Sequence, residues 1–164
     1  MRQLVFVRHS IAEDIEKHED DFSRNLTNQG IERIHKVINK INPEIIHNAI
    51  FLTSSANRCI QTCQHFAQHF SVPSHRIKEE SFLYSCFREH SFFYFLEESA
   101  ANEPNVWIFG HNPMLSNLTE QLLNKKFYSL PKGAVVAFAS TALSWIEVNY
   151  ENTSLIFFIN PKEL

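Results

Sequence analysis

Two histidines and two arginines stand where buried strands of this sequence are predicted to end. Arg8 and His9 follow a first apolar run, His111 follows a later one, and Arg58 begins the helix after a third. In an α/β sheet, ligands bind beyond the carboxyl ends of the strands. The planar fork of an arginine donates two hydrogen bonds to phosphate oxygens, and a histidine can attack phosphorus as a nucleophile. The placement favours a site for a dianionic phosphoryl group.

Predicted helix starts add to this site. Asn112 is expected to cap a helix with Pro113 at its first position, which places His111 at the helix mouth. Arg58 falls in the first turn of another helix. Free N–H groups and partial positive charge at a helix N-terminus favour an anion by about 0.3–1 kcal/mol.

Other phosphate chemistries lack their residues. The chain has three glycines, Gly30, Gly110 and Gly133, and no two have the spacing of a P-loop or a dinucleotide fingerprint. No cysteine has an arginine six residues later. The aspartates, Asp14, Asp20 and Asp21, form no Asp-x-Asp pair for an aspartyl-phosphate mechanism. Histidine remains as the nucleophile.

Gly110 is expected to give room for the turn into His111. Gly30, inside a predicted helix, indicates either a close backbone approach or a tolerated cost.

The elements that must position these residues alternate along the chain. Apolar runs predict strands over 3–8, 49–53, 76–82, 106–109, 134–139, 144–150 and 155–159, with the last two in a hairpin. Helical spacing and caps predict helices over 27–41, 54–70, 89–99 and 112–123. This order predicts one α/β domain over residues 1–164. It should be a three-layer sandwich with a mixed, mainly parallel central sheet and helices on both faces.

Composition bounds the function. With 44% apolar residues and 15 phenylalanines among 164 residues, the chain can bury a substantial core. A net charge of −3 without a basic block excludes the footprint of a nucleic-acid binder, and no apolar run reaches the length of a membrane span. The three cysteines, Cys59, Cys63 and Cys86, are too few for a disulfide framework, so cytoplasm is the expected compartment.

No metal or cofactor is expected. His65 and His69 form one helical pair and Cys59 and Cys63 another, but the two pairs lie on different faces of the predicted helix. The four side chains therefore should not meet at one ion. Four consecutive aromatic residues over 92–95 cannot all face inward on a helix, and their exposed part could contact a partner protein or a second subunit.

Four ordered motifs resemble those of the histidine phosphatase superfamily. Residues 4–9 are similar to its Arg-His-Gly signature, 54–62 to its second motif and 110–113 to its third. The segment 21–30 is similar to a pattern of the SixA-type phosphohistidine phosphatases. The resemblance covers most of the chain and implies the phosphoglycerate mutase-like fold.

The resemblance also implies residue roles. His9 would attack phosphorus and become phosphohistidine, Arg8 and Arg58 would hold the phosphoryl oxygens, and His111 would hydrogen-bond an equatorial oxygen. Arg24 would line the mouth of the pocket, with Asp21 orienting Arg24 or the loop. Further phosphate-binding or substrate-binding residues would be Ser10 and Asn112.

Two departures from the family pattern affect these roles. Ser10 replaces the glycine that follows the histidine, and it would narrow the loop or add a hydroxyl donor to the pocket. The general acid is open between Glu80, Glu79 and Glu13. A phosphohistidine substrate has a readily protonated nitrogen leaving group, so a dedicated acid is dispensable for it.

The resemblance implies a metal-independent phosphatase acting through a phosphohistidine intermediate on His9, with protein phosphohistidine as substrate. A short chain has little to build a lid, and an open pocket suits a phosphorylated protein. Two alternatives stay open: a phosphatase for a small phosphate ester, and a phosphate-binding module without turnover. Neither a nucleic acid nor a membrane is an expected partner.

Overall fold

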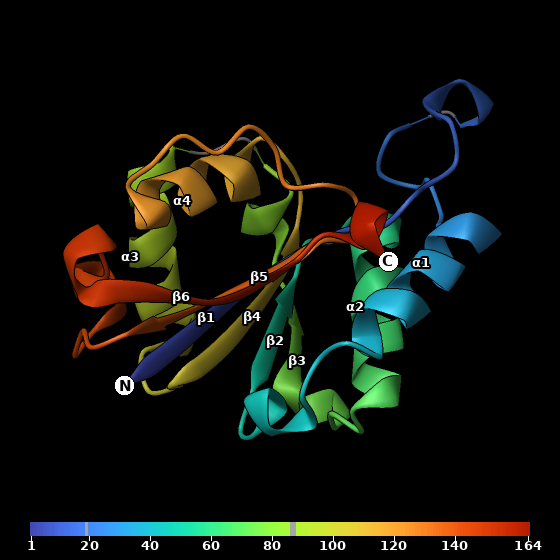
Figure 1. The fold of residues 1–164 in the computed structure, drawn as a ribbon. Helices are drawn as coiled ribbons and strands as arrows, with labels where there is room; N and C mark the ends of the chain where they lie inside the picture. Colours follow the sequence, from blue (N-terminus) through green and yellow to red (C-terminus); the bar gives the residue numbers. More distant parts are fainter. Residues whose placement is uncertain (19, 86–87) are drawn as a thin grey trace.

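The computed structural model describes residues 1–18, 20–85 and 88–164, which contain one six-stranded sheet (Figure 1). The strands are β1 (Arg2–Arg8), β2 (Ile50–Thr53), β3 (Ile77–Glu79), β4 (Asn105–Gly110), β5 (Val135–Ser140) and β6 (Thr153–Ile159). Their order is β3-β2-β4-β1-β5-β6, with β5 antiparallel to both neighbours and the other pairs parallel. The predicted mixed, mainly parallel sheet is confirmed.

Helices cover both faces of this sheet. Figure 1 shows α1 (Asn28–Ile38) and α2 (Asn57–His69) on one face, and α3 (Glu89–Ala100) and α4 (Met114–Leu123) on the other. Each face has its own apolar core. Alternate residues of β1 feed the two cores, Leu4 and Phe6 on the side of α3 and α4, Val5 and Val7 on the side of α1 and α2. This pattern explains why β1 is apolar without alternation.

A close contact ties α1 to the loop after β1. The Oγ1 of Thr27 accepts a hydrogen bond from the Gly30 N–H at 3.0 Å, which is the predicted cap. A Cβ on Gly30 would lie 2.2 Å from the carbonyl oxygen of Ile11. Of the two explanations for Gly30, the close backbone approach is therefore the one observed. Because Ile11 lies two residues beyond His9, this contact helps to fix the loop that follows the histidine.

The strand predicted over 144–150 is wrong, and so is its hairpin. A 3₁₀ turn, Trp145–Glu147, stands there, and β6 pairs directly with β5, with Ser140 opposite Thr153. Trp145 is buried against α3, where its indole N–H donates to the carbonyl of Ala100 at 2.8 Å. Packing of this large ring against the helix outweighs the local strand propensity.

The aromatic run in α3 divides between core and surface. Phe92, Phe93 and Phe95 are buried, and Tyr94 is 63% exposed, which leaves the predicted partner contact there untested. Cys86 lies outside the described residues. Within the described residues, no helix combines the length and apolarity that a membrane span requires.

Candidate active site

The ends of three adjacent parallel strands bring the predicted residues together. Arg8 ends β1, His111 directly follows β4, and Arg58 is the second residue of the helix after β2. The His9 N–H donates to the carbonyl of Gly110 at 3.1 Å, which joins the first motif to the third. The rings of His9 and His111 lie with their centroids 5.2 Å apart. The four residues therefore converge at one edge of the sheet.

A pocket of about 650 Å³ opens to solvent above these residues. We call it the basic pocket; its lining consists of Arg8, His9, Asp21, Arg24, Arg58, Tyr84, Ser85, His111, Asn112 and Lys132. Four of these side chains are cationic and one is a carboxylate. Such a cluster in a partly buried site creates a strong positive potential, which attracts an anion.

His9 presents an unprotonated nitrogen to this pocket. Its Nδ1 lies 2.7 Å from the carbonyl oxygen of Ser10, and since a carbonyl only accepts, Nδ1 carries the proton. The other nitrogen, Nε2, accepts from the Nε of Arg58 at 3.4 Å. Burial lowers the pKa of His9 to about 3, and the charges of Arg58 and Arg8 reinforce this effect. The imidazole is therefore neutral and nucleophilic at physiological pH.

Arg58 is buried and holds several groups of the site at once. Its Nη1 donates to the carbonyl of Asp21 at 2.7 Å and its Nη2 to the Oδ2 of Asp21 at 2.8 Å. The other carboxylate oxygen of Asp21 accepts two bonds from Arg24, at 2.7 and 3.1 Å. Burial alone would raise the pKa of Asp21, but its bonds to Arg58 and Arg24 lower it to about 2. Asp21 is thus an anion that bridges two arginines of the pocket.

Both ring nitrogens of His111 form hydrogen bonds. Arg58 Nη2 lies 3.4 Å from its Nδ1, which must accept because a guanidinium only donates. Its Nε2 then carries the proton and donates to the Oγ of Ser54 at 2.7 Å. Burial, followed by the charge of Arg58, lowers the pKa of His111 to about 4. Ser54 of the second predicted motif therefore orients His111.

Two polar atoms at the pocket lack partners within the described part of the chain. The Nη1 of Arg8 donates to the carbonyl of Leu130 at 2.8 Å, while its buried Nε has no partner. The amide nitrogen of Asn112 donates to Ser129 and to Leu130, and its buried Oδ1 is unpaired. A buried donor without a partner is costly. The Nε of Arg8 is therefore an unsatisfied donor in a residue that lines the basic pocket.

Asn112 does not cap α4, contrary to prediction. The helix begins at Met114 with Pro113 as its cap residue, after a cis peptide bond, and the Asn112 amide bonds the 129–130 segment instead. The expected need for space at Gly110 is also wrong, because a Cβ there would meet side chains of Met114 and Leu115 at ordinary contact distances of 3.4 Å and more.

Ser10 does not add a donor to the basic pocket. Its hydroxyl donates to the carbonyl of Gly30 at 2.8 Å, and its N–H donates to the Oγ1 of Thr62 at 3.2 Å. The side chain is fully buried and is not part of the pocket lining. Ser10 therefore fixes the loop after His9 between α1 and α2.

The three candidate general acids lie outside the lining of the basic pocket. Glu79 is exposed at the end of β3, and Glu80 follows it. Glu13 accepts from the N–H of Asn25 at 3.0 Å and lies 2.6 Å from His18. Asp21 is the carboxylate in the described lining of the basic pocket, and its pKa of about 2 makes it a poor proton donor.

Lys132, Tyr84 and Ser85 line the pocket but were not predicted. Lys132 immediately precedes Gly133, whose φ of 81° needs glycine and whose N–H bonds the carbonyls of Arg8 and His9 at 3.1 Å. Gly133 is a sequence signal that could have pointed to this segment. Only the antiparallel pairing of β5 with β1 shows that the start of β5 lies beside the end of β1. Nothing local in the sequence marks Tyr84 or Ser85.

No group of three or more potential metal ligands occurs within residues 1–18, 20–85 and 88–164. Burial raises the pKa of Cys59 to about 12, so this thiol, 3.4 Å from the Nε2 of His111, stays protonated. The absence of a metal and of a cofactor remains a prediction from the sequence.

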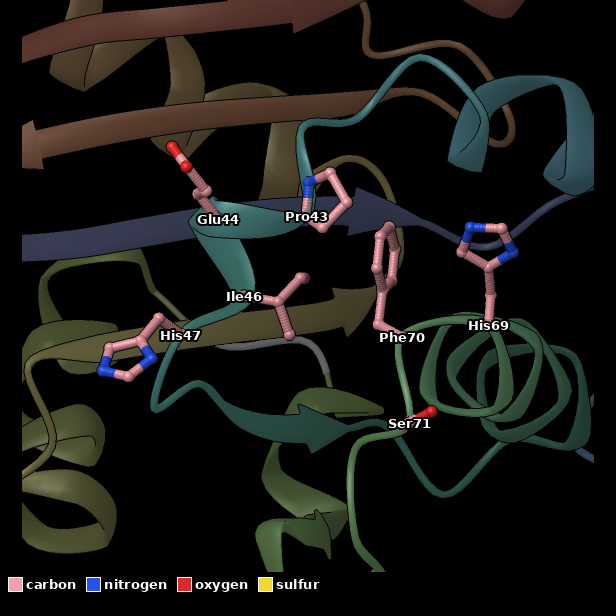
Figure 2. Close-up of a pocket in the computed structure, with 7 residues that line it drawn as sticks. All are labelled: Pro43, Glu44, Ile46, His47, His69, Phe70 and Ser71. Carbon is pink, nitrogen blue, oxygen red and sulfur yellow. The ribbon is translucent and has the colours of Figure 1, made fainter.

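A larger hollow lies near the amino ends of the parallel strands. We call it the outer groove; Figure 2 shows its seven lining residues, Pro43, Glu44, Ile46, His47, His69, Phe70 and Ser71. Its volume is about 770 Å³, and its described lining residues differ from those of the basic pocket. It forms where the turn before β2 meets the far end of α2, about 16 Å along that helix from Arg58.

Comparison with solved structures relates this architecture to known proteins. SixA from Agrobacterium tumefaciens matches with a TM-score of 0.77 at 19% identity, over 98% of each chain. The protein histidine phosphatase SixA complexed with tungstate matches with a TM-score of 0.78 at 19% identity, again over 98% of each chain.

A mycobacterial glucosyl-3-phosphoglycerate phosphatase matches more distantly, with a TM-score of 0.64 at 11% identity, over 94% of this chain and 97% of that one. No protein-family model and no curated protein sequence matches the chain. The described chain therefore has the fold of the SixA structures, with the predicted Arg-His pair at the end of its first strand.

Proposed function

We propose that this chain is a one-domain phosphatase of the histidine phosphatase superfamily, acting through a covalent phosphohistidine on His9. The observation that carries the proposal is the unprotonated Nε2 of His9, which faces a pocket with four cationic side chains. A neutral imidazole in that setting is a nucleophile beside a site for a dianion. The free, buried Cys59 and Cys63 are consistent with a reducing compartment such as the cytoplasm.

In the first half-reaction, the His9 Nε2 lone pair forms the bond to phosphorus while the bond to the leaving group breaks. Arg58 reaches the same Nε2 and is placed to hold an equatorial phosphoryl oxygen. Arg8 has a buried Nε without a partner among the described residues, and the ring of His111 lies 5.2 Å from that of His9. The two arginines stabilise the charge on the equatorial oxygens, which is the main task of a protein in phosphoryl transfer. The Nε2–H of His111 donates to Ser54 and its Nδ1 accepts from Arg58, so in this tautomer His111 positions Arg58 and has no N–H left for the expected bond to an equatorial oxygen.

In the second half-reaction, water attacks phosphorus, the bond to His9 breaks, and inorganic phosphate leaves. The Ser10 carbonyl keeps the Nδ1 proton in place throughout, so Nε2 is regenerated as the free base. The leaving group of the first step takes one proton from solvent. An imidazole is basic enough to leave in this way, which suits a site whose carboxylate, Asp21, has a pKa of about 2.

Protein phosphohistidine is the substrate that we propose. The basic pocket opens directly to solvent, so a phosphorylated side chain on a protein surface can enter it. The SixA structure with tungstate, a tetrahedral oxyanion, is a solved example of this fold with such an anion bound.

The test compares kcat/KM on a phosphohistidine-bearing phosphotransfer protein with kcat/KM on p-nitrophenyl phosphate, with His9→Ala as the blank. Rapid quench at alkaline pH and mass spectrometry then locate the acid-labile phosphoryl group on the enzyme. We expect a marked preference for the protein and a phosphoryl group on His9.

Hydrolysis of p-nitrophenyl phosphate alone would keep the mechanism and replace the protein by a small phosphate ester. Equal turnover by the wild type and the blank would contradict the proposal and favour a phosphate-binding module.

A further inference from the structure

A second, narrower hollow adjoins the basic pocket. We call it the side cavity; its volume is about 180 Å³, and its lining consists of Leu83, Tyr84, Ser85, Glu89, His111, Asn112, Pro113, Met114 and Asn117. Four of these residues, Tyr84, Ser85, His111 and Asn112, also line the basic pocket. The side cavity therefore borders the basic pocket along these four residues.

The size of the side cavity indicates what it can hold. Cavities that bind whole small ligands measure roughly 300–1,000 Å³. At about 180 Å³, the side cavity suits one side chain or one ring rather than a complete metabolite. Its walls between the 83–84 segment and the start of α4 include Leu83, Pro113 and Met114, which favour a flat apolar body.

The two hollows differ in charge. The basic pocket carries four cations and the carboxylate of Asp21, whereas the described lining of the side cavity carries the carboxylate of Glu89, at the start of α3. The Nδ2 of Asn117 donates to Glu89 at 2.6 Å and holds its carboxylate. Hydrogen bonds to this carboxylate lower its pKa, so it is an anion at neutral pH. A ligand that spans both hollows should be negative at one end and basic at the other.

We propose that the side cavity binds the leaving group of the substrate, with Glu89 as the residue that selects planar, basic leaving groups over acidic ones. This inference rests on the proposed function, because it assumes that the phosphoryl group lies in the basic pocket. Substrates of this kind are phosphoramidates of basic side chains, whose leaving nitrogen gains a proton as the bond to phosphorus breaks. Sugar phosphates with a second acidic group meet the carboxylate of Glu89 and are disfavoured.

Three non-hydrolysable probes test the side cavity by calorimetry: methylphosphonate, 4-(aminomethyl)phenylphosphonate and 4-carboxyphenylphosphonate. The two aryl probes share the phenylphosphonate body and carry opposite charges at the far end of the ring. Glu89→Gln should lower the preference for the aminomethyl over the carboxy probe by about fivefold, and Glu89→Lys should lower it further, since charge attraction becomes repulsion. Glu98→Gln, an exposed glutamate on the same helix, is the matched control and should keep the wild-type ratio.

A steric variant tests whether the side cavity is occupied. Asn117→Trp places a large ring in the lining of the side cavity and should weaken both aryl probes by at least about tenfold, with methylphosphonate, which is too short to reach it, bound as in the wild type. Gln121→Trp, one turn further along α4 and outside the cavity lining, is the control for a tryptophan on that helix.

The outcomes separate this inference from the proposed function. If Glu89→Gln and Glu89→Lys leave the ratio of the aryl Kd values unchanged, or Asn117→Trp weakens methylphosphonate as much as the aryl probes, the leaving-group site is overturned. Hydrolysis of simple phosphoramidate by the wild type is measured separately. Because its leaving group is ammonia, that assay reports on His9 and the basic pocket without the side cavity.

Discussion

The basic pocket and the outer groove lie at opposite ends of the parallel strands and differ in the residues that line them. Each contains two histidines, but His9 and His111 are partly or wholly buried beside arginines, whereas His47 and His69 are exposed. The outer groove is larger, at about 770 Å³ against 650 Å³, yet its described lining contains no arginine or lysine. Size therefore does not identify the site here; the convergence of fixed charges around a neutral imidazole does.

Removing the nucleophile is the strongest test of this difference. We expect His9→Ala to lower kcat by at least about 10⁴-fold, because the covalent intermediate can no longer form. His69→Ala in the outer groove should leave kcat within about twofold. The measurement is phosphatase turnover with both variants shown to be folded by circular dichroism. Substantial residual activity of His9→Ala would remove His9 as the nucleophile.

An arginine in an ion pair occurs at each end of the parallel strands, and the two allow a second comparison of the site with a region away from it. Arg58 pairs with Asp21 at the site, and Arg76 pairs with Glu103 away from it, at 2.8 and 2.7 Å. Arg58→Ala should lower kcat by on the order of 10³-fold, since an arginine that stabilises the transferring phosphoryl group is lost. Arg76→Ala should change kcat less than about twofold. A loss below about tenfold for Arg58→Ala would argue against its contact with the transferring group.

The buried histidines should also make stability depend on pH. In the native state the pKa of His9 is lowered to about 3 and that of His111 to about 4, so the unfolded chain binds more protons below pH 6.5. Stability is then greatest above pH 6.5 and falls as the pH drops toward 4. We expect His9→Gln/His111→Gln to flatten the dependence of the urea midpoint on pH between 7 and 4.5.

The control for this experiment is His47→Gln/His69→Gln in the outer groove, which should keep the wild-type slope. An unchanged slope in the site variant would mean that the two buried imidazoles are not the source of the pH dependence.

A serine-to-glycine substitution in each region should change the free energy of unfolding by different, smaller amounts. Ser10→Gly removes the hydroxyl bond to the Gly30 carbonyl and should lower the free energy of unfolding by about 1 kcal/mol. Ser71→Gly, at a φ of 55° on the rim of the outer groove, should be close to neutral because glycine accepts this conformation. Urea unfolding of both variants checks the contrast, and an equal loss in the two would contradict the role of Ser10.

The smallest expected effect is that of a chelator. EDTA should leave kcat unchanged, since within the described residues no cluster of metal ligands occurs at either hollow. Loss of activity that a divalent ion restores would contradict a metal-independent mechanism.

The sequence by itself predicted the six strands, most of the helices and the positions of four site residues at or just beyond the strand ends. Short apolar runs and helical spacing are local properties, and Arg8, His9, Arg58 and His111 follow directly from where those elements end. The same local reasoning failed over 144–150, where Trp145 packs on α3, and at Asn112, whose amide bonds a distant loop.

Only the tertiary structure decided how the remaining residues serve the site. The hydroxyl of Ser10 points to Gly30 rather than into the pocket, and Lys132 reaches the site because β5 runs antiparallel to β1. Tyr84 meets His111 with ring centroids 5.7 Å apart through packing between segments far apart in sequence. These are contacts between separate elements, and a periodic pattern within one element carries no information about which neighbour it will meet.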